Sequence, residues 1–111
     1  MKKINNFIHG KITSYSDSIL PIYDPSKGEQ ISQVVNSNDQ DFKNTIKSSK
    51  EGYKIWKEFT PLKRSRIIAN FKNLIENNIE ELATLVSKEH GKTLEDAKGS
   101  VIRGLEVVEF A

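Results

Sequence analysis

The stretch EHGKTLEDAKGSVIRGLEVVEFA, residues 89–111, decides the fold. A helix is expected to begin at Thr93, with Asp96 as its capping-box partner. Five apolar residues then fall within one narrow stripe of this helix: Leu94, Ala97, Val101, Leu105 and Val108. This stripe predicts packing against neighbouring helices of the same chain, because an amphipathic helix buries its apolar face.

The opposite side of the same helix is less usual. At about 100° per residue, Arg103, Val107 and Phe110 cluster there, so the last two turns are apolar on two sides. A helix that is apolar all round is expected to be buried all round. Gly99 and Gly104 each cost roughly 1 kcal/mol of helix stability relative to alanine, a cost often linked to close approach by another backbone. The helix is therefore expected to pack against more protein than this chain contains, with a dimer interface or a frayed end as alternatives.

Arg103 has two interpretations. A guanidinium among apolar neighbours is rarely left unpaired, and Glu106 lies three residues further on, within reach on the same helix face. Alternatively, the planar guanidinium receives a carboxylate ligand, since arginine suits bidentate anions. From the residues alone both remain open. Lys92 could reach an anion, but a solvated lysine is expected.

Three further helices are predicted upstream, each with a start signal. The first begins near Ser37 or Asn38, both good N-cap residues. Thr60-Pro61 combines an N-cap with a proline in the first turn and starts the second. Asn78 followed by Glu81 resembles a capping box and starts the third.

Apolar residues recur at helical spacing along these three helices. Their core-facing stripes are expected to be Phe42, Ile46, Ser49, Tyr53 and Trp56; then Ile67, Ile68, Phe71, Leu74 and Ile75; then Ile79, Leu82, Ala83, Leu85 and Val86. The third helix is expected to end at His90-Gly91, because glycine adopts the left-handed conformation of a helix C-cap without strain.

Residues 1–36 have the pattern of short strands and turns. Gly10-Lys11 is predicted as a tight turn between two strands, and residues 24–28 (DPSKG) form a strong turn signal. Pro21 indicates that its strand is an edge strand or begins late. The expected organisation is an α+β fold, a β-hairpin segment at 1–36 followed by a layer of about four helices at 37–111, forming one incomplete domain.

Composition narrows the functional class. Hydrophobic residues make up 36% and charged residues 29%, which is typical of a soluble globular protein. No apolar run approaches the roughly 18 residues of a membrane span. The net charge of +2 is too small to indicate nucleic acid. The absence of cysteine excludes disulfides and cysteine nucleophiles within these residues, and His9 and His90 are too far apart in sequence to indicate a metal site.

Several segments match the pattern of one known family. FIHGK resembles an early INGK hairpin, with His9 where asparagine is usual, and IYDPSKGEQISQV resembles NPxTGExIxxV. Trp56, Pro61, Arg64 and Arg66 resemble a W…PLxxRxxI stretch. Residues 89–111 resemble EHGKTxxDAxGEVxRGxEVVEFA, with Ser100 in place of glutamate. The chain thus resembles the leading segment of the aldehyde dehydrogenase superfamily, and within it the CoA-acylating methylmalonate-semialdehyde (malonate-semialdehyde) dehydrogenase branch.

The resemblance implies a parent roughly four times longer, in which the helical layer packs on a nucleotide-binding domain. The parent would be a cytoplasmic, homo-oligomeric oxidoreductase that uses NAD and CoA to convert malonate or methylmalonate semialdehyde to acetyl- or propionyl-CoA. Its nucleophilic cysteine would lie beyond these residues. This chain alone is therefore expected to be inactive and to bind no cofactor, metal, nucleic acid or membrane. Its expected partner is the rest of the dehydrogenase.

The resemblance also implies a role for Arg103, as the residue that meets the substrate carboxylate, with Glu106 able to orient it. No catalytic, cofactor-binding or metal-binding residue is expected among residues 1–111. Two rival hypotheses remain. One is a self-standing α+β interaction module without catalysis, and the other is a fragment of an aldehyde dehydrogenase that hydrolyses its thioester.

Overall fold

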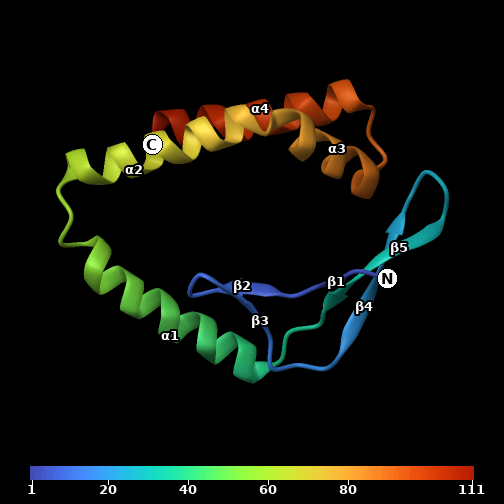
Figure 1. The fold of residues 1–111 in the computed structure, drawn as a ribbon, viewed down its shortest axis with the longest axis horizontal. Coiled ribbons are helices and arrows are strands. Elements are labelled where there is room, and N and C mark those ends of the chain that lie inside the picture. Colours follow the sequence, from blue (N-terminus) through green and yellow to red (C-terminus); the bar gives the residue numbers. More distant parts are fainter. The chain divides into compact units, whose positions relative to one another are not determined.

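The structure, a computed structural model, describes residues 1–111 and contains five strands and four helices (Figure 1). The strands are β1 (Lys3–Ile4), β2 (Asn6–Ile8), β3 (Lys11–Thr13), β4 (Ile19–Asp24) and β5 (Glu29–Val35). The helices are α1 (Asp39–Trp56), α2 (Pro61–Asn77), α3 (Ile79–His90) and α4 (Leu94–Phe110). The predicted order, strands followed by four helices, is confirmed.

The chain divides into two compact units. The first comprises residues 1–23 and 28–58, and the second comprises residues 24–27 and 59–111. Helix α1 therefore belongs with the strands, whereas α2, α3 and α4 form a helical unit.

The first unit contains two small sheets. One has the strand order β1-β5-β4, in which β1 runs parallel to β5 with Lys3 opposite Gln33. β4 lies at the edge, which confirms the expectation from Pro21, because an edge strand tolerates a residue without an N–H. The second sheet is the antiparallel β2–β3 hairpin, with Phe7 opposite Ile12.

The β2–β3 turn lies one residue earlier than predicted. His9 and Gly10 are the turn residues, with φ of 54° and 72°, and Lys11 already belongs to β3. A two-residue hairpin loop of this kind needs positive φ at both central positions. The prediction of Gly10-Lys11 was wrong because the turn uses His9 at positive φ, a conformation that is uncommon among residues other than glycine.

Asp41 connects the start of α1 to the segment after β3. The N-cap Asn38 and Asp41 form a reciprocal capping box, in which Asn38 Oδ1 accepts from Asp41 N at 3.0 Å and Asp41 Oδ2 accepts from Asn38 N at 3.1 Å. The same carboxylate accepts the N–H groups of Tyr15, at 2.6 Å, and Ser16, at 3.2 Å. The predicted N-cap at Asn38 is confirmed. In addition, the Asp41 carboxylate links this cap to the backbone of Tyr15 and Ser16.

In the second unit, α4 packs against both α2 and α3. Ala83 of α3 and Ala97 of α4 are completely buried, and their small side chains allow the two helices to approach closely. Lys98 pairs with Glu80 across these two helices. Lys72 of α2 donates to Glu109 of α4 at 3.3 Å, and this carboxylate raises the pKa of Lys72.

Three of the four remaining predicted caps are confirmed in full or in part. Thr60 caps α2, and its Oγ1 accepts from Lys63 N at 3.1 Å. Gly91 caps α3 with φ of 82°, as predicted. Thr93 Oγ1 accepts from Asp96 N at 3.2 Å, but the reciprocal bond of a capping box is not formed. The capping box at Asn78 was wrong. Asn78 closes α2 as well as opening α3, and its amide group donates back to Leu74 O at 2.7 Å.

The predicted core-facing stripes are only partly buried. On α1, Phe42 and Tyr53 are 63% and 64% exposed. On α2, Phe71 and Leu74 are 50% and 61% exposed. The expectation that these stripes are buried within the chain was wrong, since neither unit contains enough protein to cover both sides of its helices. The buried apolar positions are few: Ile8, Val35, Ala83 and Ala97.

Candidate functional sites

Arg103 lies on the exposed flank of α4, where it shares a hydroxyl group with a second cation. Its Nη2 donates to Ser100 Oγ at 3.3 Å, and Lys92 Nζ donates to the same oxygen at 2.9 Å. The Ser100 hydroxyl in turn donates to Asp96 O at 3.3 Å. Ser100 lies one helical turn before Arg103, and Lys92 reaches it from the segment just before α4, so the geometry is local.

Neither cation of this cluster has a carboxylate partner. The pairing of Arg103 with Glu106 is not formed, and Lys92 makes no ion pair either. Lys92 is half-buried rather than fully solvated, which differs from its expected state. We define Lys92, Ser100 and Arg103 as the α4 cation cluster. Two positive charges that share one neutral hydroxyl favour the binding of an anion. The planar guanidinium matches the geometry of a carboxylate.

The second unit also exposes apolar surface on two sides of α4. An apolar groove of about 500 Å³ opens between α2, α3 and α4. It is lined by Phe71, Ile75, Leu82, Leu85, Val86, Val101, Gly104, Leu105 and Val108. On the other side, Val107 is 70% exposed and Phe110 is 96% exposed. The prediction that the chain leaves the last turns of α4 uncovered is confirmed.

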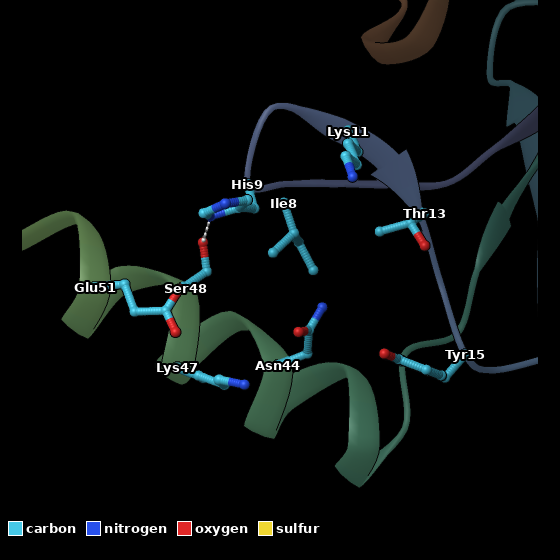
Figure 2. A pocket seen from close by; sticks show the side chains of 9 residues that line it. All are labelled: Ile8, His9, Lys11, Thr13, Tyr15, Asn44, Lys47, Ser48 and Glu51. Carbon is cyan, nitrogen blue, oxygen red and sulfur yellow. Dashed lines mark hydrogen bonds between the residues drawn. The ribbon is translucent and has the colours of Figure 1, made fainter.

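A polar pocket of about 300 Å³ lies between the β2–β3 hairpin and α1, within the first unit (Figure 2). The hairpin and the residues after it contribute Ile8, His9, Lys11, Thr13 and Tyr15; α1 contributes Asn44, Lys47, Ser48 and Glu51. Ser48 Oγ lies 3.4 Å from His9 Nδ1, which is the hydrogen bond drawn in Figure 2. No sequence motif predicts this pocket, because its residues come from two segments, 8–15 and 44–51, that become neighbours only through the fold of the first unit.

The residues present do not fit a dinucleotide. Rossmann folds bind the pyrophosphate with a glycine-rich turn that follows a strand and opens a helix. α1 is the one helix here that follows a strand, and the intervening residues 36–38 (NSN) contain no glycine. No step through NAD is therefore assigned to this chain. No three histidine, aspartate or glutamate side chains gather in a way that could hold a metal ion, and none of the four helices is long and apolar enough to cross a membrane.

Comparison with known proteins identifies similar sequences and structures over nearly the whole chain. Residues 12–111 match the aldehyde dehydrogenase family. The chain is 39% identical over 106 residues to a Dictyostelium discoideum protein named as a probable acylating methylmalonate-semialdehyde/malonate-semialdehyde dehydrogenase, covering 95% of this chain and 20% of that protein. It is 34% identical over 112 residues to a malonate-semialdehyde dehydrogenase of Lacticaseibacillus casei, covering 100% of this chain and 23% of that protein. The chain thus spans about a fifth of the length of these curated relatives.

Two solved structures are similar in fold. A Sinorhizobium meliloti protein assigned as a methylmalonate-semialdehyde dehydrogenase, complexed with NAD, matches with a TM-score of 0.96 at 38% identity over 99% of this chain and 23% of that chain. A methylmalonate-semialdehyde dehydrogenase of Oceanimonas doudoroffii matches with a TM-score of 0.95 at 30% identity, over 99% of this chain and 22% of that chain. The expected α+β fold, part of a larger aldehyde dehydrogenase-like fold, is confirmed.

Proposed function

This chain belongs to the aldehyde dehydrogenase family, and we propose that it is the leading part of an NAD-dependent, CoA-acylating oxidoreductase acting on malonate or methylmalonate semialdehyde. The names of the relatives support this substrate class. In this proposal residues 1–111 supply substrate recognition and packing surface. The remainder of the dehydrogenase, absent here, supplies the cysteine nucleophile and the NAD and CoA sites, so 1–111 alone has no turnover.

The α4 cation cluster is the main observation that supports the proposed substrate class. Malonate and methylmalonate semialdehydes carry a carboxylate as well as an aldehyde, so an enzyme selective for them needs a fixed positive group for the carboxylate. Arg103 is exposed and has no carboxylate partner. Its one hydrogen bond, to Ser100, uses a single N–H and leaves the rest of the guanidinium fork available for an anion.

The exposed apolar surfaces support the second part of the proposal. Burying a side chain such as Phe110 is worth roughly 1.5–3 kcal/mol, and it is 96% exposed here. Contiguous apolar surface of this kind marks an interaction site. We propose that the groove and the flank with Val107 and Phe110 pack against the rest of the dehydrogenase and that the whole enzyme is a homo-oligomer.

A chimera tests the substrate proposal. Residues 1–111 replace the matching segment of the Lacticaseibacillus casei malonate-semialdehyde dehydrogenase, and NADH formation is measured with malonate semialdehyde and with propanal. Arg103→Gln should lower kcat/KM for malonate semialdehyde at least about tenfold, since a hydrogen bond between charged groups is lost. Propanal has no carboxylate, so its kcat/KM should change less than about twofold.

Arg66→Gln is the matched control, because Arg66 is also exposed but lies on α2 outside the α4 cation cluster. Arg66→Gln should leave kcat/KM unchanged for both malonate semialdehyde and propanal. An equal loss for both aldehydes in Arg103→Gln would contradict the carboxylate role. The product of the chimera distinguishes CoA acylation from thioester hydrolysis. An acyl-CoA product supports the proposal, whereas a free acid would identify a hydrolytic dehydrogenase. An inactive chimera that still folds would favour the interaction module.

A further inference from the structure

We propose that the polar pocket between the β2–β3 hairpin and α1 binds a phosphate-type oxyanion. The pocket lies wholly in the first unit and uses none of the residues on which the proposed function rests. Its volume, about 300 Å³, is ample for inorganic phosphate or a small phosphate ester. Figure 2 shows its polar side chains distributed on the hairpin and on α1, on two sides of one space.

The first argument is the supply of free donors. Lys11 of β3 and Lys47 of α1 form no ion pair and no hydrogen bond through their ammonium groups. The Thr13 hydroxyl, the Tyr15 hydroxyl and the Asn44 amide also have no side-chain partner within the chain, although Thr13 and Asn44 are half-buried. In Figure 2 the Tyr15 hydroxyl points toward Asn44 across the pocket. Five donor-bearing groups therefore face one space without being satisfied by the protein.

The second argument is charge. The pocket has two lysines, Lys11 and Lys47, and one carboxylate, Glu51. The charge of the lining is therefore net positive. Water satisfies such donors in a free protein, and a multiply charged anion replaces that water with charge-assisted hydrogen bonds, which are about twice as strong as neutral ones.

The third argument distinguishes phosphate from carboxylate. No arginine lines the pocket, so it offers no planar fork of the kind that matches a carboxylate. Instead it offers ammonium point charges, hydroxyls and an amide on two opposing walls. A tetrahedral anion presents oxygens in several directions and can accept from both walls at once, and lysine is a common phosphate-binding residue.

The walls of the pocket are held in place by contacts already described. Ile8 is buried beneath it, with 8% of its surface exposed. The left-handed backbone of His9 turns the hairpin at the pocket, where the imidazole meets Ser48. Asp41 ties the first turn of α1 to Tyr15, one of the lining residues. The two backbone segments that carry the donors are therefore held in place before binding, which lowers the entropic cost of binding.

Titration of the 111-residue chain with inorganic phosphate at constant ionic strength tests the proposal. In ¹H–¹⁵N NMR spectra, saturable shifts are expected at residues 8–15 and 44–51. Lys47→Gln should weaken phosphate binding about two- to fivefold, the range expected for one solvated charge contact. Lys50→Gln removes the same charge from the same helix outside the lining and should change affinity less than about 1.5-fold.

Glu51→Gln should change the phosphate affinity in the opposite direction to Lys47→Gln. It removes the one carboxylate of the lining and should strengthen phosphate binding, which no loss of folding could imitate. Sulfate should compete with phosphate, and acetate at the same ionic strength should compete poorly. Shifts scattered over both units, or equal losses in Lys47→Gln and Lys50→Gln, would overturn the proposal. So would an unchanged or weaker affinity in Glu51→Gln.

Discussion

Asp41 is the most deeply buried charged side chain, with 1% of its surface exposed. Its carboxylate accepts three backbone N–H groups, from Tyr15, Ser16 and Asn38. The N–H of Tyr15 is the largest cause of a lowered pKa, and the N–H groups of Asn38 and Ser16 act in the same direction against the opposing effect of burial. A capping box can be predicted from sequence, but the contact to residues 15 and 16 depends on the path of the chain after β3.

Asp41→Asn should destabilise the first unit, because an amide offers only one acceptor oxygen and brings two donors that have no partners there. The expected decrease in Tm is at least about 5 °C, measured by circular dichroism. Asp39→Asn is the control. Asp39 lies in the same first turn but is 75% exposed, so its ion pair with Lys43 contributes little. Equal Tm values for the two variants would show that the hydrogen bonds of Asp41 do not stabilise the first unit.

The same residue predicts a pH dependence. Since the pKa of Asp41 is lowered in the folded protein, its ionised form stabilises the fold at pH values above 3.8, the ordinary value. This stabilisation is lost as the pH falls through the lowered value. Urea unfolding at pH 7 and at pH 3 should therefore show a gap between the wild type and Asp41→Asn that narrows in acid. A gap that widens in acid would contradict the assignment.

His9→Asn should stabilise the β2–β3 hairpin. His9 has φ of 54°, and asparagine adopts this left-handed region more readily. The expected gain in the free energy of unfolding is about 0.5 kcal/mol, measured by urea denaturation. Gly10→Ala, at φ of 72°, should have the opposite effect and cost about 1 kcal/mol. A stabilising Gly10→Ala would show that the turn has a different conformation in solution.

At the scale of elements, the contact between α3 and α4 depends on small side chains. Ala83 and Ala97 are fully buried, so we expect a larger side chain at either position to displace its neighbours. Ala97→Leu should therefore lower the free energy of unfolding by about 1–3 kcal/mol, measured by chemical denaturation. Ala69→Leu, at an exposed position of α2, should be nearly neutral. Comparable losses in both variants would contradict this packing.

All four helices and the turn at residues 24–28 could be predicted from the sequence, because their signals are local. Thr60-Pro61, Gly91 and Thr93 act through the backbone of their own helices, and each begins or ends a helix as expected. The wrong details have non-local or competing causes. Asn78 bonds back to Leu74 because it lies between two helices, and the parallel pairing of β1 with β5 joins segments about thirty residues apart.

At the scale of the whole molecule, helical periodicity identified the apolar faces but could not say what covers them. Periodicity reports that a face is apolar, whereas burial depends on how much protein is present. Phe71, Leu74 and Phe110 are therefore apolar as predicted and at least half exposed in the structure. Of the α4 cation cluster, the sequence favoured a carboxylate-binding role for Arg103 alone, and Lys92 was expected to be solvated. The bond from Lys92 to Ser100 required the folded segment before α4.

The central claim is that α4 packs against more protein than this chain contains. Hydrogen exchange of residues 101–110 tests it most directly, in the 111-residue chain at two concentrations and in the Lacticaseibacillus casei chimera. We predict rapid, concentration-independent exchange in the chain alone and at least about hundredfold slower exchange in the chimera, because only the chimera covers both sides of the helix. Equal protection in the two proteins, or protection that rises with the concentration of the chain alone, would contradict the claim.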